Sequence, residues 1–248
     1  MRPLVIVPTY NERENVQRLM PQLLDIPDLR VLVVDDASPD GTGFAAEVLA
    51  ERSEGRLSVM HRVGRPRGLG HAYLDGIRRA LETDADVICQ MDADLSHQPK
   101  HLVTMLEAVQ HADLVVGSRY VPGGRIVNWP LRRKLLSAGA NVYIRAICSI
   151  AVHDCTSGFR CWRRDTLASL PLHRIDAEGY AFLVQLLYEA LAIGATVSEV
   201  PITFVERENG HSKLRLEILA ESAILPWKLA FSRAAGPVRA RSIAVPGR

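Results

Sequence analysis

The chain has 248 residues, of which 48% are hydrophobic and 23% are charged, and its formal net charge is +2 at pH 7. This composition is typical of a globular protein and excludes a disordered or fibrous chain. The small net charge gives no argument for nucleic-acid binding, and we expect no nucleic-acid partner.

The four cysteines and the apolar segments bear on the compartment. No CxxC pair occurs, which favours a reducing environment. The first residues lack the long apolar stretch of a signal peptide, and no apolar run approaches the ~20 residues that cross a bilayer. We therefore expect a cytoplasmic protein without a transmembrane anchor.

Short apolar runs alternate with helix-like segments through the first half of the chain. Strands are predicted at 4–7, 31–34, 57–61, 87–91 and 114–117. Strands that alternate with helices indicate an α/β fold, in which a mostly parallel sheet is flanked by helices. We therefore expect the helix after the first strand to pack on this sheet through an apolar stripe of Val16, Leu19, Leu23 and Leu24.

The pattern changes after Arg119, where Pro122, Gly123 and Gly124 indicate a loop. Helices are predicted at 131–150, 180–192 and 218–231, and strands at 159–162 and 196–205. The last helix is amphipathic and fits a helix on a surface, either on the core of the protein or on a membrane.

Polar residues follow the early strands, where an open α/β sheet forms its ligand crevice. The first strand leads into Pro8, Tyr10 and Glu12 rather than a GxGxxG turn, which disfavours a nicotinamide enzyme. After the second strand come Asp35 and Asp36. A carboxylate there can accept hydrogen bonds from ribose or a base, although Asp35 fits a turn role equally well.

The fourth strand ends in Met91-Asp92-Ala93-Asp94, followed by Ser96. Alternation along an extended segment directs both carboxylates to the same side. Two oxygen ligands in this position suit Mg²⁺ or Mn²⁺ held together with substrate phosphates. A lone DxD is a weak signal, but its place directly after an apolar strand strengthens the interpretation.

Basic residues supply what a metal-bound diphosphate still needs. Arg119 follows the fifth strand, Arg133 belongs to a basic cluster, and Arg207 and Lys213 lie in a glycine-containing loop. Guanidinium groups bind phosphate bidentately, whereas lysine provides a point charge. The 64–71 segment is another phosphate candidate, although close packing of the helix that follows would require the same glycines.

Taken together, these motifs resemble family 2 glycosyltransferases, and among them the polyprenyl-phosphate mannose synthases. The resemblance extends from Pro3 to about Phe231. The segments that carry it include Val7-Pro8-Thr9-Tyr10-Asn11-Glu12, Val33-Val34-Asp35-Asp36, Met91-Asp92-Ala93-Asp94-Leu95-Ser96-His97, Gly117-Ser118-Arg119-Tyr120, Asn128-Trp129-Pro130, Ser157-Gly158-Phe159-Arg160 and the stretch from Glu199 to Lys213.

The resemblance implies a GT-A fold and transfer of mannose, with inversion, from GDP-mannose to a polyprenyl monophosphate. It also implies one catalytic domain, 1–235, with a donor-binding half of about 1–120, an acceptor- or membrane-facing half of about 121–235, and a flexible tail at 236–248.

The resemblance also assigns roles to individual residues. The donor would be bound by Pro8, Tyr10, Glu12, Val34, Asp36, Asp92, Ala93, Asp94, Ser96, Arg119, Arg207 and Lys213. Catalysis would involve Asp92, Asp94, Arg119 and Arg133, with Arg133 facing the acceptor phosphate. Asp94 would be the main metal ligand, together with Ser96. Some relatives carry Gln at the position of Ser96, and the shorter serine raises the question whether it reaches the metal directly.

Many members of this family have carboxy-terminal transmembrane helices or a membrane partner, and this chain resembles the soluble catalytic type. The resemblance therefore implies peripheral contact with the cytoplasmic face of a membrane, directly or through a membrane-anchored partner protein. Two alternatives stay open: transfer of another sugar from a UDP donor, and a non-catalytic nucleotide-binding subunit of a membrane complex. A phosphotransferase that uses Asp92 as nucleophile is disfavoured because Ser96 stands where Thr or Val is expected.

Overall fold

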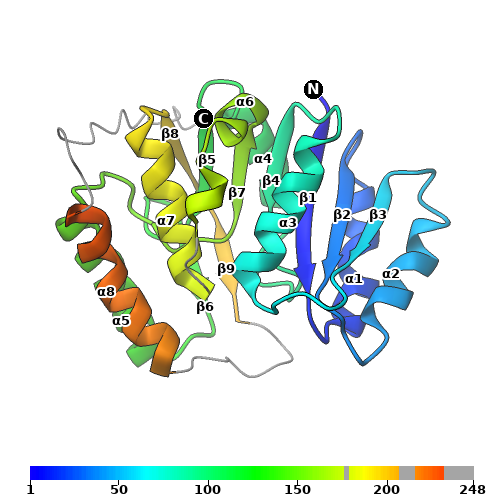
Figure 1. The fold of residues 1–248 in the computed structure, drawn as a ribbon, viewed down its shortest axis with the longest axis horizontal. Helices are drawn as coiled ribbons and strands as arrows, with labels where there is room; N and C mark the ends of the chain where they lie inside the picture. The colour runs from blue at the N-terminus through cyan, green and yellow to red at the C-terminus, as the bar shows by residue number, and fades with distance from the viewer. Residues whose placement is uncertain (176–178, 207–215, 232–248) are drawn as a thin grey trace.

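The computed structural model describes residues 1–175, 179–206 and 216–231 (Figure 1). Each predicted strand and helix is present, with ends shifted by a few residues, except for the strand at 196–205. In chain order the elements are β1 (Pro3–Thr9), α1 (Arg13–Leu24), β2 (Arg30–Asp35), α2 (Thr42–Ala50), β3 (Leu57–His61), α3 (Leu69–Leu81), β4 (Val87–Gln90), α4 (Lys100–Ala108), β5 (Leu114–Ser118), β6 (Arg125–Val127), α5 (Leu131–Cys148), β7 (Arg160–Arg163), α6 (Arg164–Ala168), a 3-10 turn (Leu172–Arg174), α7 (Gly179–Ala192), β8 (Val197–Pro201), β9 (Thr203–Val205) and α8 (Leu216–Phe231).

A seven-stranded sheet with the order β3-β2-β1-β4-β7-β5-β8 forms the centre of the molecule. The neighbouring pairs are parallel, except that β7 runs antiparallel to both β4 and β5. The predicted mostly parallel α/β sheet is therefore confirmed.

Side-chain alternation along the strands divides the core between the two faces of the sheet. On one face, Leu4 and Ile6 of β1 belong to an apolar cluster that includes residues of α3 and α7. On the other, Val5 and Val7 belong to a cluster that includes residues of α1 and α4. Because helices pack on both faces of the sheet, the strands are held in place and the loops that follow them begin at fixed positions.

The strand predicted at 196–205 is divided into two. β8 pairs with β5 in the large sheet, whereas β9 pairs with β6 in a separate two-stranded sheet. The change follows Pro201, which has no N–H to donate to a neighbouring strand. Ile202 lies between them and its N–H donates to the Ser118 carbonyl. As a result, β9 leaves the large sheet beside the end of β5.

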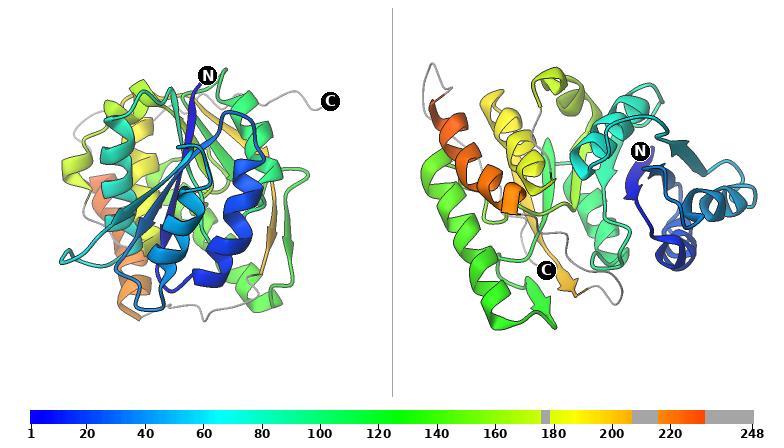
Figure 2. Two further views of the ribbon diagram at one scale, coloured as in Figure 1. Left: turned by 90° about the vertical axis from the view of Figure 1, so that its right-hand side faces the viewer. Right: turned by 60° about the horizontal axis from the view of Figure 1, so that its bottom comes forward.

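The helices α5 and α8 pack beside one another and away from the centre of the sheet (Figure 2). The hydroxyl of Tyr143 in α5 donates to the main-chain oxygen of Ala223 in α8 at 2.6 Å. α8 also contacts α7, through which it joins the main core. In the described part of the chain, no helix combines the length and apolar character needed to span a bilayer.

Candidate functional site

The site lies where β1, β2, β4 and β5 end, at the lower edge of the large sheet in Figure 1. The strands run in the same direction, so the residues that follow them meet at one edge. The register brings Thr9 at the end of β1 opposite Asp35 at the end of β2. The Thr9 hydroxyl donates to Asp35 Oδ1 at 3.2 Å, which ties the two strand ends together.

Asp35 and Asp36 have different structural roles. Asp35 accepts hydrogen bonds from the Ser38 N–H at 3.1 Å and the Ser38 hydroxyl at 2.5 Å, so it forms the turn after β2. Asp36 is buried, and its two oxygens accept from the Arg62 guanidinium and the Gly68 N–H. Of the two readings of Asp35, the turn role is the one that its contacts support.

The same contacts fix the 64–71 segment. Gly68 has φ +145°, which favours glycine, and its N–H is used by Asp36. Arg62, which is 2% exposed, also donates to the Pro66 carbonyl. Backbone conformation therefore accounts for Gly68 without a bound phosphate.

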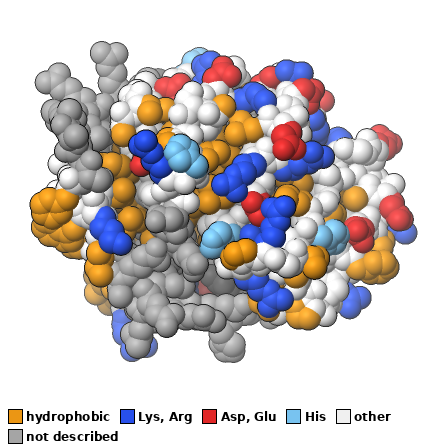
Figure 3. All heavy atoms as spheres, in the orientation of Figure 1, with side chains coloured by type: hydrophobic (Ala, Val, Ile, Leu, Met, Phe, Trp, Pro, Cys, Tyr) orange, Lys and Arg blue, Asp and Glu red, His pale blue; other side chains and the backbone are white. Residues whose placement is uncertain are grey.

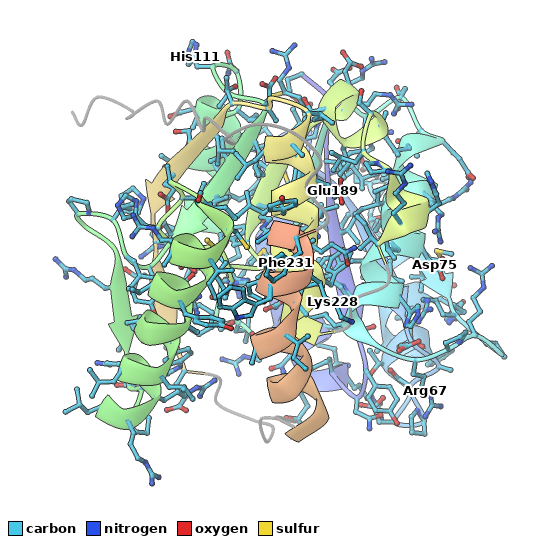
Figure 4. All side chains as sticks on the ribbon, turned by 60° about the vertical axis from the view of Figure 1, so that its left-hand side comes forward. Arg67, Asp75, His111, Glu189, Lys228 and Phe231 are labelled. Atoms are coloured by element: carbon cyan, nitrogen blue, oxygen red, sulfur yellow. The ribbon has the colours of Figure 1, made fainter. Side chains whose placement is uncertain are left out.

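Residues predicted to bind the nucleoside differ in accessibility. Tyr10 is partly exposed, and the Arg67 guanidinium lies 5.0 Å from the centre of its ring and 3.2 Å from its hydroxyl oxygen. Arg67 is exposed, and Figure 4 shows it at the lower right of the molecule. Glu12 is partly exposed and accepts from the Asn15 amide at 2.5 Å.

Pro8 and Val34 are opposite one another in the β1–β2 ladder and are both buried. The Val34 side chain belongs to the core cluster on the α3 face of the sheet. Its Cγ2 methyl group lies 3.0 Å from the position that a Cβ atom at residue 76 would occupy, so Gly76 allows α3 to pack closely there. The Val34 side chain thus belongs to the core beneath the strand ends.

The loop after β4 carries Asp92 and Asp94. The Tyr73 hydroxyl from α3 donates to Asp92 Oδ1 at 3.1 Å, and the Asp92 side chain is 32% exposed. Asp94 is buried, and its Oδ1 accepts from the Ser96 N–H at 3.1 Å and the Ser96 hydroxyl at 2.5 Å. Ser96 therefore orients the Asp94 carboxylate. Ala93 between the two aspartates is 4% exposed.

His97 packs against this loop on its buried side. Its Nδ1 accepts the Asp92 N–H at 3.3 Å, and its ring stacks on Phe159 with centres 4.9 Å apart. The imidazole is 2% exposed. Burial lowers the pKa of His97, against the opposing influence of the Asp92 and Asp94 carboxylates. The neutral ring thus acts as an acceptor within the protein.

Tyr73 and Arg160 reinforce the same region. Burial, together with the Asp92 carboxylate, raises the pKa of Tyr73 well above its ordinary value, so its hydroxyl remains a donor. Arg160 is completely buried and donates to the carbonyls of Cys155, Ser157 and Leu183. Burial lowers its pKa to about 10, which leaves it protonated at neutral pH.

The donor atoms of the Asp92–Ser96 loop suit a hard divalent cation. Carboxylate and hydroxyl oxygens are the ligands that Mg²⁺ and Mn²⁺ prefer. Among the described residues, no group of three or more His, Cys, Asp or Glu side chains could hold a metal by itself. An ion here would need oxygens from a bound substrate to complete its coordination, which is how Mg²⁺ is commonly held with phosphates.

Arg119 is fixed by a buried carboxylate. Its Nε and Nη2 donate to the two oxygens of Asp154, each at 2.7 Å, and its backbone N–H also donates to Asp154. The Arg119 side chain is 7% exposed and that of Asp154 is 0% exposed. Glu199 in turn accepts the Asp154 N–H at 3.0 Å. The guanidinium is thus held in one orientation beside the end of β5.

Arg133 lies in the first turn of α5. Its guanidinium carbon is 3.9 Å from the centre of the Trp129 ring, and its Nη1 donates to Glu206 Oε1 at 2.9 Å. Arg119 and Arg133 both lie over Trp129, with Arg119 at 5.8 Å. The predicted residues Arg207 and Lys213 lie outside the described residues, as does the neighbouring Ser212.

Two residues at the site, Asp154 and Tyr73, are not predicted by the sequence motifs. Asp154 lies 35 positions from Arg119, and Tyr73 lies 19 positions from Asp92. Asp154 lies three residues before the 157–160 motif, and an acidic residue shortly after the apolar 150–152 run was the available signal. Tyr73 lies on the buried face of α3, and its spacing there is that of any core residue.

Comparison with known proteins gives consistent matches. Residues 4–170 match the profile of "Glycosyl transferase family 2". The undecaprenyl-phosphate mannosyltransferase of Micrococcus luteus is 46% identical over 233 residues, which cover 93% of this chain and 95% of that protein. The polyprenol monophosphomannose synthase of Mycolicibacterium smegmatis is 45% identical over 244 residues, which cover 96% and 92%.

The solved structures include glucosyl-3-phosphoglycerate synthase from Mycobacterium tuberculosis, determined with Mn²⁺, UDP and phosphoglyceric acid. It superposes with a TM-score of 0.68 over 92% of this chain and 78% of that chain, at 19% sequence identity. A second structure of that enzyme, with UDP, gives a TM-score of 0.65 at 20% identity. These likenesses confirm the predicted GT-A fold.

Proposed function

Because the chain belongs to glycosyl transferase family 2, we propose that this glycosyltransferase moves mannose from GDP-mannose to a polyprenyl monophosphate, with inversion. The observation that carries the proposal is the loop after β4, where Asp92 and an Asp94 oriented by Ser96 lie at the same edge of the sheet as Arg119, which follows β5. The acceptor class comes from the two relatives, which are named for undecaprenyl-phosphate and polyprenol monophosphomannose chemistry. The GDP-mannose donor comes from the resemblance of the sequence motifs.

In this proposal the donor lies across the lower edge of the sheet. Pro8, Tyr10, Glu12, Val34 and Asp36 form the nucleoside end, with Pro8 and Val34 beneath it. Asp94, oriented by Ser96, and Asp92 would hold Mg²⁺ or Mn²⁺, which would neutralise charge on the diphosphate. Ala93, Arg119, Arg207 and Lys213 complete the donor site.

The reaction is a single displacement. An oxygen of the acceptor phosphate forms a bond to the anomeric carbon of mannose, and the bond from that carbon to GDP breaks, with the electron pair leaving on GDP. A phosphate monoester has a second pKa of about 6, so its oxygen is already ionised at neutral pH and needs no protein base. The enclosed position of His97 agrees with a reaction that uses no histidine base.

Transfer of radiolabelled mannose from GDP-mannose to a short polyprenyl phosphate, with and without EDTA, tests this function. Labelled lipid that disappears with EDTA is the expected result. Labelling only from a UDP sugar would replace the donor. Failure with both donors would leave the chain as a nucleotide-binding subunit of a membrane complex, and overturn the proposal.

The acceptor role of Arg133 gives a separate prediction. Arg133→Ala is expected to raise the KM for polyprenyl phosphate about tenfold or more and to leave the KM for GDP-mannose near the wild-type value, because a charge-assisted phosphate contact is lost. Initial rates with each substrate varied in turn measure both constants. An unchanged acceptor KM would remove Arg133 from this role.

We further propose that α5 and α8 rest on the cytoplasmic face of the membrane, where the lipid acceptor is found. Apolar side chains stand exposed on both helices: Leu131 70%, Leu135 65%, Leu136 62%, Val142 62%, Ile224 54%, Trp227 49% and Phe231 80%. The exposed Arg132 and Lys228 add positive charge to the same helices. Figure 3 shows hydrophobic atoms at the left edge, over α8, and Figure 4 shows Lys228 and Phe231 on that helix. Apolar and basic side chains together favour binding to an anionic bilayer.

The variant Trp227→Ser/Phe231→Ser is expected to reduce binding to anionic liposomes at least about tenfold, because two exposed aromatic side chains are lost. Sedimentation with liposomes measures the effect. Phe44→Ser is the matched control, since Phe44 is 69% exposed on α2. Equal losses in both variants, or none in either, would contradict this surface and leave an anchored partner protein as the route to the membrane.

A further inference from the structure

Trp129 is buried but belongs to neither of the two large apolar clusters on the faces of the sheet. β6 ends at Val127, and Asn128 adopts φ 66° before the chain enters α5. Asn128 and Pro130 are exposed, yet Trp129 between them is only 9% exposed. The turn therefore directs one large aromatic side chain into the protein at the start of α5.

The face of Trp129 is in contact with a cation. The Arg133 guanidinium lies 3.9 Å from the ring centre, the shortest of the cation–ring distances measured among the described residues. Glu206 holds the same guanidinium by a hydrogen bond of 2.9 Å, and the Arg133 side chain keeps 26% of its surface exposed. The aromatic face and the carboxylate together restrict a long side chain that would otherwise sample many rotamers.

Trp129 is itself held by the elements that surround the Asp92–Ser96 loop. Phe204 of β9 packs edge-on against Trp129 at 5.4 Å and against His97 at 5.3 Å. The Ser96 carbonyl accepts the N–H of Val205, which follows Phe204. The rings of His97, Phe204 and Trp129 thus form a continuous set of contacts from the Asp92–Ser96 loop to Arg133.

We infer that Trp129 is a positioning residue, which holds Arg133 so that its guanidinium meets the acceptor phosphate at a fixed distance from the donor. The inference rests on the proposed function, because it takes the acceptor role of Arg133 from there. Arg119 is less dependent on Trp129, since it lies farther from the ring and is fixed by Asp154.

The test compares Trp129→Phe, which keeps an aromatic face, with Trp129→Leu, which removes it. Calorimetric binding of a short, water-soluble polyprenyl phosphate gives an acceptor Kd without turnover. Trp129→Leu is expected to raise this Kd about tenfold, and Trp129→Phe about threefold or less. The Kd for GDP is expected to stay at the wild-type value in both variants.

A double-mutant cycle separates positioning from general damage. In an Arg133→Ala background, Trp129→Leu should add little to the acceptor Kd, because the group that it positions is absent. Independent, multiplicative effects of the two changes, or equal losses in Trp129→Phe and Trp129→Leu, would overturn the inference. Absence of mannose transfer by the wild-type protein would instead overturn the proposed function, since the Kd series does not depend on transfer.

Discussion

Asp94→Ala is expected to lower the rate of mannose transfer at least about a thousandfold, which makes it one of the two largest effects that we predict. Asp94 is 8% exposed and both hydrogen-bonding groups of Ser96 orient its carboxylate, so water does not readily substitute for it. In the proposed reaction, a divalent cation balances the negative charge of the departing diphosphate. The substitution would remove the main ligand of that cation. Initial rates at saturating GDP-mannose and Mg²⁺ or Mn²⁺ measure the effect.

Ser96→Ala and His97→Ala are the matched controls for Asp94→Ala. Ser96→Ala keeps the carboxylate and removes one of its hydrogen bonds, so a loss of about tenfold is expected. His97→Ala removes a ring that supports the loop, and much of the transfer rate per folded molecule should remain. A loss in His97→Ala comparable to that of Asp94→Ala would contradict a reaction without a protein base.

The sequence carries enough information to predict the lower edge of the sheet. Asp36 and the Asp92–Asp94 pair follow short apolar runs, and the strand rhythm implies a shared direction, so their approach at one edge could be expected. The direction of β7 could not be predicted in this way. Its apolar residues Cys161 and Trp162 look the same in either direction, and only tertiary pairing inserts this strand between β4 and β5.

Local sequence patterns also do not predict contacts between residues that are far apart in the chain. The sequence predicts Arg119 as a phosphate ligand, but no pattern predicts that Asp154, 35 positions away, pairs with it. Val34 illustrates the opposite difficulty. Its place two residues before Asp36 suggests the crevice, yet the alternation of β2 turns its side chain into the core with Leu32.

Asp154→Ala is expected to destabilise the protein by about 3–5 kcal/mol and to abolish transfer, because it leaves the buried Arg119 without its counter-charge. Both oxygens of Asp154 are engaged with Arg119, and neither side chain is accessible enough for water to replace the contact. Urea unfolding measures the stability. Transfer rates per folded molecule separate the positioning of Arg119 from the loss of folded protein.

Two further variants make the origin of this destabilisation measurable. Arg119→Met/Asp154→Ala should recover part of the lost stability, because no uncompensated charge is then buried, and it should still transfer no mannose. Asp86→Ala breaks the exposed ion pair between Arg2 and Asp86, whose side chains are 57% and 44% exposed. It should leave the unfolding curve near that of the wild type, since water screens such pairs. If Asp154→Ala unfolded no more easily than Asp86→Ala, the buried pair would not be what holds Arg119 at the end of β5.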